Sequence, residues 1–107
     1  MKIVFDFEGS LDKHPEIGVL MHELTRSGHH TIVLFTDPKS DINELLLSAN
    51  LRPGSYFQTA EVRGGYVAKA YFCRDHEVDL IIDNEMNKIV EIGALSPKTV
   101  RLFVHDS

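Results

Sequence analysis

Side chains that could transfer or bind a phosphate group stand where apolar runs of this sequence end. Asp6 and Glu8 follow the first apolar run, and Thr36 ends the second. Asp83 ends a later apolar run, and Lys69 lies in the amphipathic stretch that precedes it. An aspartate can attack phosphorus and carry the phosphoryl group covalently, while a second acid protonates the leaving oxygen. A hydroxyl, an ammonium and a hard divalent cation can hold the transferring oxygens.

These side chains can act together only if the fold brings the ends of the runs to one edge. Short apolar runs alternate with amphipathic stretches, which predicts an α/β domain. We expect strands at residues 2–7, 31–35, 55–59, 78–82 and 99–104. We expect helices at residues 15–26, 42–49, 66–75 and 86–95.

Strands separated by helical crossovers predict a mainly parallel, five-stranded sheet with helices on both faces. The expected architecture is therefore a three-layer sandwich, and residues 1–107 are expected to form one domain. In such sheets functional residues gather beyond the carboxyl ends of the strands. The sequence thus predicts that the strand-end acids and Thr36 converge at one edge.

Four motifs, in order along the chain, resemble those of the haloacid dehalogenase-like (HAD) superfamily. The run DFEGSL at residues 6–11 is similar to its DxDGT signature, and HTIVLFT at residues 30–36 to its second motif. Lys69 fits the third motif, with Arg63 as a rival, and LIIDNE at residues 80–85 resembles the fourth. The resemblance implies a HAD-like Rossmannoid core without a cap, since the gaps between the motifs have no room for one.

The resemblance implies catalytic and metal-binding roles for the carboxylates. Asp6 would be the nucleophile and a ligand of Mg²⁺, the implied cofactor. Glu8 would give a backbone carbonyl to the metal and act as general acid and base. Asp83 would complete the metal site, supported by Asn84 or Glu85. Glu8 is one methylene longer than the family's usual aspartate, which indicates weakened or altered turnover.

The resemblance also implies a phosphate-binding set, made up of Gly9, Ser10, Thr36 and Lys69. Thr36 and Lys69 would count as catalytic too, because they would hold the phosphoryl oxygens and steady the charge around Asp6. The implied function is a Mg²⁺-dependent phosphohydrolase or phosphotransferase that forms an aspartyl-phosphate. Its open site would suit a large or partner-presented phosphorylated substrate.

Two other functions stay open at this point. The chain could be a weakened member of the superfamily that binds a phosphorylated ligand or a protein partner. It could also be a receiver-like signalling domain, which uses strand-end acids, a hydroxyl and a lysine in a parallel sheet. The receiver hypothesis fits poorly, because the expected strand at residues 55–59 and its flanks supply no phospho-accepting aspartate.

Composition limits the classes of partner and the cellular location that we expect for this protein. The net charge is −5, which is not the basic footprint of broad nucleic-acid binding. No stretch approaches a membrane span and the first residues do not make a signal peptide, so we expect a cytoplasmic protein without a membrane partner. The open edges of a small parallel sheet favour a homodimer.

Overall fold

The computed structural model describes residues 1–52 and 56–104, apart from the side chains of residues 86–89. The strands are β1 (Lys2–Asp6), β2 (His30–Thr36), β3 (Gln58–Val62), β4 (Leu80–Asp83) and β5 (Val100–Phe103). The tight turn η1 (Phe7–Leu11) follows β1, and the helices are α1 (Pro15–Arg26), α2 (Ile42–Ser48), α3 (Gly65–Asp75) and α4 (Met86–Leu95).

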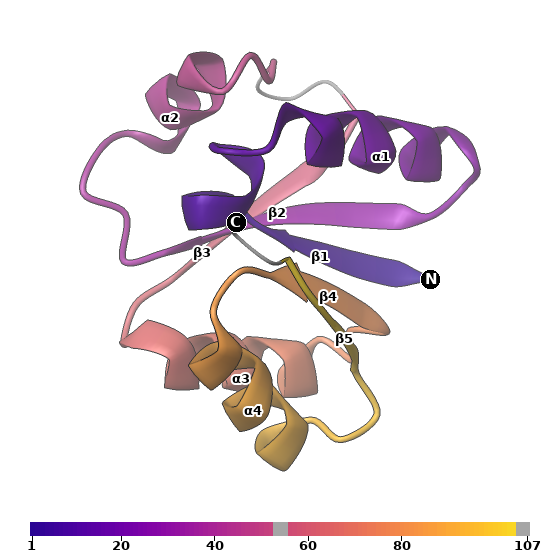
Figure 1. Cartoon of the computed structure of the whole chain (residues 1–107), viewed down its shortest axis with the longest axis vertical. Helices are drawn as coiled ribbons and strands as arrows, with labels where there is room; N and C mark the ends of the chain where they lie inside the picture. Colours follow the sequence, from indigo (N-terminus) through magenta and orange to yellow (C-terminus); the bar gives the residue numbers. More distant parts are fainter. Residues whose placement is uncertain (53–55, 105–107) are drawn as a thin grey trace.

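The strands form one sheet in the order β3-β2-β1-β4-β5, and every neighbouring pair is parallel. Figure 1 shows α1 and α2 on one side of this sheet and α3 and α4 on the other. The predicted three-layer α/β architecture around a five-stranded parallel sheet is therefore confirmed. Because all strands are parallel, their carboxyl ends meet at one edge.

Two apolar cores, one on each face of the sheet, explain the continuous apolar runs of the central strands. Val33 and Phe35 of β2 pack in the core beneath α1 and α2. Ile32 and Leu34 point to the other face, into the core beneath α3 and α4. A strand that is covered on both faces needs apolar residues at every position, so β2 shows no polar alternation.

The third strand lies further along the chain than the sequence predicted. The expected strand at residues 55–59 begins at Ser55, which lies outside the described residues, whereas β3 spans Gln58–Val62. Its register is set by pairing with β2, in which Ile32 lies opposite Gln58 and Thr36 opposite Val62. An edge strand is only partly covered, so β3 lacks the apolar run that marks the central strands.

In the described part of the chain, none of the helices is long and apolar enough to span a lipid bilayer. The cytoplasmic location stays a prediction from the sequence.

Candidate functional site

A buried ion cluster joins the ends of β1 and β4 at the carboxyl edge of the sheet. Lys69 Nζ, which α3 carries, donates a hydrogen bond to Asp6 Oδ1. The same ammonium donates to Asp83 Oδ2 over 2.8 Å. All three side chains are fully buried. The structure thus brings together three of the residues that the sequence singled out, from three separate elements.

The Lys69 ammonium is held in its charged form by its two partners. Burial opposes the charge, but the neighbouring Asp6 and Asp83 carboxylates outweigh it, so the pKa of Lys69 is raised above its ordinary value. Lys69 therefore acts as a permanent internal cation at neutral pH. Removal of this cation would leave two carboxylates buried beside each other.

Neutral donors complete the hydrogen bonding around the Asp6 carboxylate. Ser10 Oγ donates to Asp6 Oδ2 over 3.3 Å. With its amide nitrogen turned toward these acceptors, Asn84 donates to Asp6 Oδ2 at 3.0 Å, to Asp83 Oδ1 at 3.2 Å and to the Glu8 carbonyl at 3.1 Å. Sequence reasoning gave Asn84 only a supporting role. An amide in place of an acid, directly after a strand-end aspartate, was the signal for this donor role.

Asn84 and Gly9 lie in close contact just beyond the ends of β4 and β1. The order of the strands reverses between these two strands, and ligands of open parallel sheets usually bind in the crevice at that point. Gly9 has a φ of 83°, and a Cβ added there would lie 2.0 Å from the Asn84 amide. Its backbone N–H donates to Asp12 Oδ1 over 2.7 Å. This close contact leaves no room for a ligand atom between Gly9 and Asn84.

Glu8 and Thr36 meet over the end of β2. Glu8 Oε1 accepts a hydrogen bond from the Thr36 backbone N–H at 3.1 Å. Thr36 Oγ1 is buried and makes no hydrogen bond within the described residues. Glu8 thus ties the turn after β1 to the end of β2, whereas Asp6 and Asp83 are held by Lys69.

The three predicted ligands of Mg²⁺ do not form a metal site in this arrangement. The Lys69 ammonium bridges Asp6 and Asp83, while Glu8 binds the backbone of Thr36. Among the described residues, no group of three or more His, Cys, Asp or Glu side chains could hold a metal ion. Residues placed in this way do not fit Mg²⁺, and the cofactor assignment stays a prediction from the sequence.

A magnesium titration tests that assignment directly. We expect Mg²⁺ to leave the melting temperature of the wild-type chain unchanged, because the Lys69 ammonium already bridges the two buried carboxylates. Melting curves with Mg²⁺ and with a chelator give the comparison, and Asp83→Asn is the matched variant. A rise with Mg²⁺ in wild type that Asp83→Asn abolishes would contradict the expectation and support the cofactor assignment.

Asp37 fixes the position of α3, and with it the position of Lys69. Its two carboxylate oxygens accept hydrogen bonds from Gly64 N at 2.9 Å and from Gly65 N at 2.8 Å. A carboxylate is favoured at a helix N-terminus, where backbone N–H groups are exposed. The Gly64–Gly65 pair at the start of α3 was the signal for this contact.

Arg63, the rival for the third motif, does not reach the ion cluster. Its guanidinium donates to Glu61 and, over 3.5 Å, to the Pro38 carbonyl. Its side chain is two-thirds exposed, at 66%. Lys69 is therefore the cation that contacts Asp6.

A cavity of about 270 Å³ opens at the carboxyl edge beside the ion cluster. Its walls come from the turn after β1, the segment after β2 and the start of α2. The lining combines three apolar residues with three acids, one lysine and one hydroxyl: Phe7, Pro38, Leu45, Glu8, Asp12, Asp37, Lys39 and Ser40. Such a mixture offers both an apolar contact surface and directional hydrogen-bonding groups.

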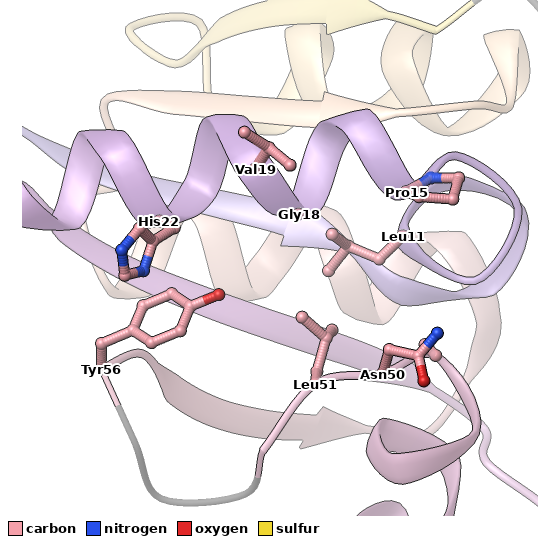
Figure 2. Close-up of a pocket in the computed structure, with 9 residues that line it drawn as sticks. Leu11, Pro15, Gly18, Val19, His22, Asn50, Leu51 and Tyr56 are labelled. Atoms are coloured by element: carbon pink, nitrogen blue, oxygen red, sulfur yellow. The ribbon is translucent and has the colours of Figure 1, made fainter.

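A second cavity, of about 340 Å³, lies between α1 and the segments around Leu51 and Tyr56 (Figure 2). The rings of His22 and Tyr56 meet edge to face with centroids 4.7 Å apart. Burial raises the pKa of the Tyr56 hydroxyl. None of its lining residues is Asp, Glu, Lys or Arg, and none belongs to the predicted site. This cavity is a mainly apolar hollow outside the ion cluster.

Comparisons with known proteins show that the fold of this chain is similar to that of a solved structure. No family model matches the chain, and no curated protein matches it. A solved structure described as a universal stress protein in complex with cAMP superimposes with a TM-score of 0.70 and 20% sequence identity. The match covers 100% of this chain and 98% of that chain.

The assignment to the HAD superfamily was wrong. A solved structure that matches the whole chain is described as a universal stress protein, and no family model matches. The predicted Mg²⁺-dependent phosphatase function, which rested on that assignment, was therefore wrong as well. The physical reason lies at Asp6, whose fully buried carboxylate is held by Lys69 and Ser10 and is not exposed for attack on phosphorus. Acids at the ends of apolar parallel strands are common to different families with this kind of sheet, so the motifs alone did not identify the family.

Proposed function

We propose that this chain is a nucleotide-binding domain without covalent chemistry at Asp6. The observation that carries the proposal is the 270 Å³ cavity at the carboxyl edge, where Glu8, Asp37 and Lys39 face the same space. The likeness to a universal stress protein with bound cAMP suggests the class of ligand. In this proposal the ion cluster is a structural element next to the ligand, and none of its side chains takes part in a reaction.

The apolar walls of the cavity suit the face of a purine base. Phe7 comes from the turn after β1, and its ring lies 4.6 Å from that of Phe35 in the core, which holds it in place. Pro38 and Leu45 line the cavity from the segment after β2 and from α2. An aromatic ring and two aliphatic side chains can cover both faces of a flat heterocycle.

The acidic residues suit the donor groups of a nucleoside. An ionised carboxylate offers about four acceptor positions, and Glu8, Asp12 and Asp37 bring three carboxylates to the cavity. Ribose hydroxyls and an exocyclic amine are such donors, and an acid commonly binds ribose hydroxyls in nucleotide-binding sheets. Lys39 and Ser40 would then contact the phosphate.

The charge balance of the cavity favours a ligand with a single phosphate. Three carboxylates and one lysine line it, so each additional negative charge on the ligand meets repulsion. We therefore expect cAMP and adenosine monophosphate to bind more tightly than ATP, and inorganic phosphate alone not to bind. Isothermal titration calorimetry with these four probes tests the order. Absence of binding by any nucleotide would refute the proposed function.

Lys39→Ala tests where the phosphate lies. Loss of one charge-assisted hydrogen bond costs about 1.5 kcal/mol, so the affinity for cAMP should fall about tenfold. The affinity for adenosine, which has no phosphate, should not change. Lys98→Ala is the matched control, because Lys98 is an exposed lysine just before β5, at the opposite edge of the sheet. Equal affinities of Lys39→Ala and wild type for cAMP would place the phosphate elsewhere.

A further inference from the structure

The apolar hollow between α1 and the segments around Leu51 and Tyr56 has a buried base and an open side. Its volume is about 340 Å³. Leu11 and Leu51 line it and are buried, because both belong to the core on this face of the sheet. Val19 also lines it and is 65% exposed, so the hollow opens to solvent. Pockets of this size with mainly apolar walls are typical binding sites for small organic molecules.

Gly18 makes room for the hollow and lowers the stability of α1. It lies inside this helix, where glycine is less favourable than alanine because its backbone loses more freedom on folding. Close packing does not require it. A Cβ added at Gly18 would lie 3.6 Å from Leu51 Cδ2, which is an ordinary van der Waals contact. Alanine would therefore fit and stabilise the helix, but it would narrow the hollow. This combination favours a binding site over a gap left by packing.

Three polar side chains line the hollow at its two ends. Figure 2 shows His22 and Tyr56 at one end and Asn50 at the other, with the Tyr56 hydroxyl directed toward the middle. Within the described part of the chain, these three side chains make no hydrogen bond. Burial raises the pKa of the Tyr56 hydroxyl, so it keeps its proton and can donate to a ligand.

The backbone after α2 holds the wall that faces α1. Asn50 has a φ of 60°, in the left-handed region that asparagine adopts more readily than most residues. Its N–H donates to the Leu47 carbonyl over 3.0 Å, and the Leu51 N–H donates to the Leu46 carbonyl over 2.9 Å. These bonds close the end of α2 while Leu51 packs in the core. The wall is therefore formed before any ligand binds.

We propose that this hollow binds a neutral, two-ring aromatic molecule that carries a hydrogen-bonding group at each end. A charged ligand would be poorly compensated, since no Asp, Glu, Lys or Arg lines the hollow. An apolar cavity of about 150 Å³ holds one benzene ring, so roughly twice that volume suits two fused rings. The aliphatic walls would cover the ring faces, while Tyr56 and Asn50 would bind the polar ends.

This site is separate from the cavity at the carboxyl edge, and it does not depend on the function proposed for that cavity. The two cavities share no lining residue. Their linings also differ in charge, because three carboxylates and one lysine line the cavity at the carboxyl edge. The two sites should therefore take different ligands and fill independently.

Calorimetric titration with a dihydroxynaphthalene, whose two hydroxyls lie at opposite ends of the rings, tests the proposal. We expect one molecule of this diol to bind per chain. The naphthalene dicarboxylate with the same substitution pattern should not bind, because it carries two charges. Saturating cAMP should leave the affinity for the diol unchanged. Absence of diol binding, equal binding of the dicarboxylate, or displacement of the diol by cAMP would overturn the proposal.

Gly18→Ala should have two effects of opposite sign. The melting temperature should rise by about 4 °C, because alanine is favoured inside a helix. The affinity for the diol should fall about tenfold, because the added methyl group occupies space that the ligand needs. A hollow without a ligand would show the rise in melting temperature alone. Wild-type affinity in this variant would therefore refute the site.

Tyr56→Phe tests the polar end of the site. The variant keeps the ring that packs against His22 and removes only the hydroxyl. Loss of one neutral hydrogen bond should lower the affinity for the diol about fivefold. Tyr71→Phe is the matched control, since Tyr71 is an exposed tyrosine of α3 that does not line the hollow, and its affinity should equal that of wild type. Equal affinities of Tyr56→Phe and wild type would contradict the proposed contact.

Discussion

Replacing Lys69 with methionine is expected to destabilise the folded chain by roughly 3–5 kcal/mol, the cost of removing one partner from a buried ion pair. Methionine fills a similar volume but carries no charge, so Asp6 and Asp83 would be left buried side by side without their cation. Urea unfolding followed by circular dichroism measures the change. Lys98→Met, at an exposed lysine, should alter the free energy of unfolding by less than about 0.5 kcal/mol.

The pH dependence distinguishes loss of charge from loss of packing. The pKa of Lys69 is raised in the folded chain, so its stabilisation is fully present below the unfolded pKa, near 10.5. That stabilisation is lost as the pH rises through the still higher folded pKa. In Lys69→Met, two buried carboxylates of like charge gain from taking up a proton, so the deficit should shrink on acidification. A deficit that is constant with pH would indicate a packing effect alone.

A neutral version of the cluster keeps this prediction testable if Lys69→Met fails to fold. Asp6→Asn and Asp83→Asn, added to Lys69→Met, remove every charge of the cluster while nearly preserving its volume. Replacement of a whole buried ion cluster by neutral groups is often neutral for stability. We expect the triple variant to fold and to be more stable than Lys69→Met. A triple variant that is no more stable would show that charge balance is not what holds this edge of the sheet together.

Gly9→Ala is expected to cost roughly 4–5 kcal/mol, the sum of a backbone term and a contact term. A residue with a Cβ at a φ of 83° loses about 1–2 kcal/mol through strain. The added Cβ would also lie 2.0 Å from the Asn84 amide and displace it from its three hydrogen bonds. Each such bond contributes about 1 kcal/mol. Urea unfolding of the variant measures the total.

Gly28→Ala separates the cost of backbone strain from the cost of the contact with Asn84. Gly28 has a φ of 94°, yet an added Cβ there would meet nothing within 4 Å. Its substitution should therefore show the backbone term alone, about 1 kcal/mol. Asn84→Ala in the Gly9→Ala background should relieve the clash, so the two substitutions should be less than additive. Equal costs for Gly9→Ala and Gly28→Ala would refute the close contact between Gly9 and Asn84.

Much of the architecture was predictable from local patterns. The apolar run at residues 31–35 predicted a strand covered on both faces, and β2 is buried between two cores. The helix expected at residues 15–26 has the bounds of α1, in which a proline stands in the first turn and Gly28 follows the last. The bounds of the edge strands were harder to predict from the sequence. β3 is partly exposed, so burial left no apolar pattern in its sequence to mark its bounds.

The positions of Asp6 and Asp83 at strand ends and of Lys69 on a helix were determined by the sequence, but their chemistry was not. Periodicity predicts which residues end a strand, because burial imposes it locally along the chain. Whether an aspartate is exposed as a nucleophile or held by an ammonium depends on contacts between distant segments, and Asp6 and Lys69 are 63 residues apart. The roles of Asn84 and Asp37 also arise from such contacts. The sequence alone therefore determined a parallel α/β sheet with polar groups at its carboxyl edge, and the tertiary structure decided that three of them form one buried ion cluster.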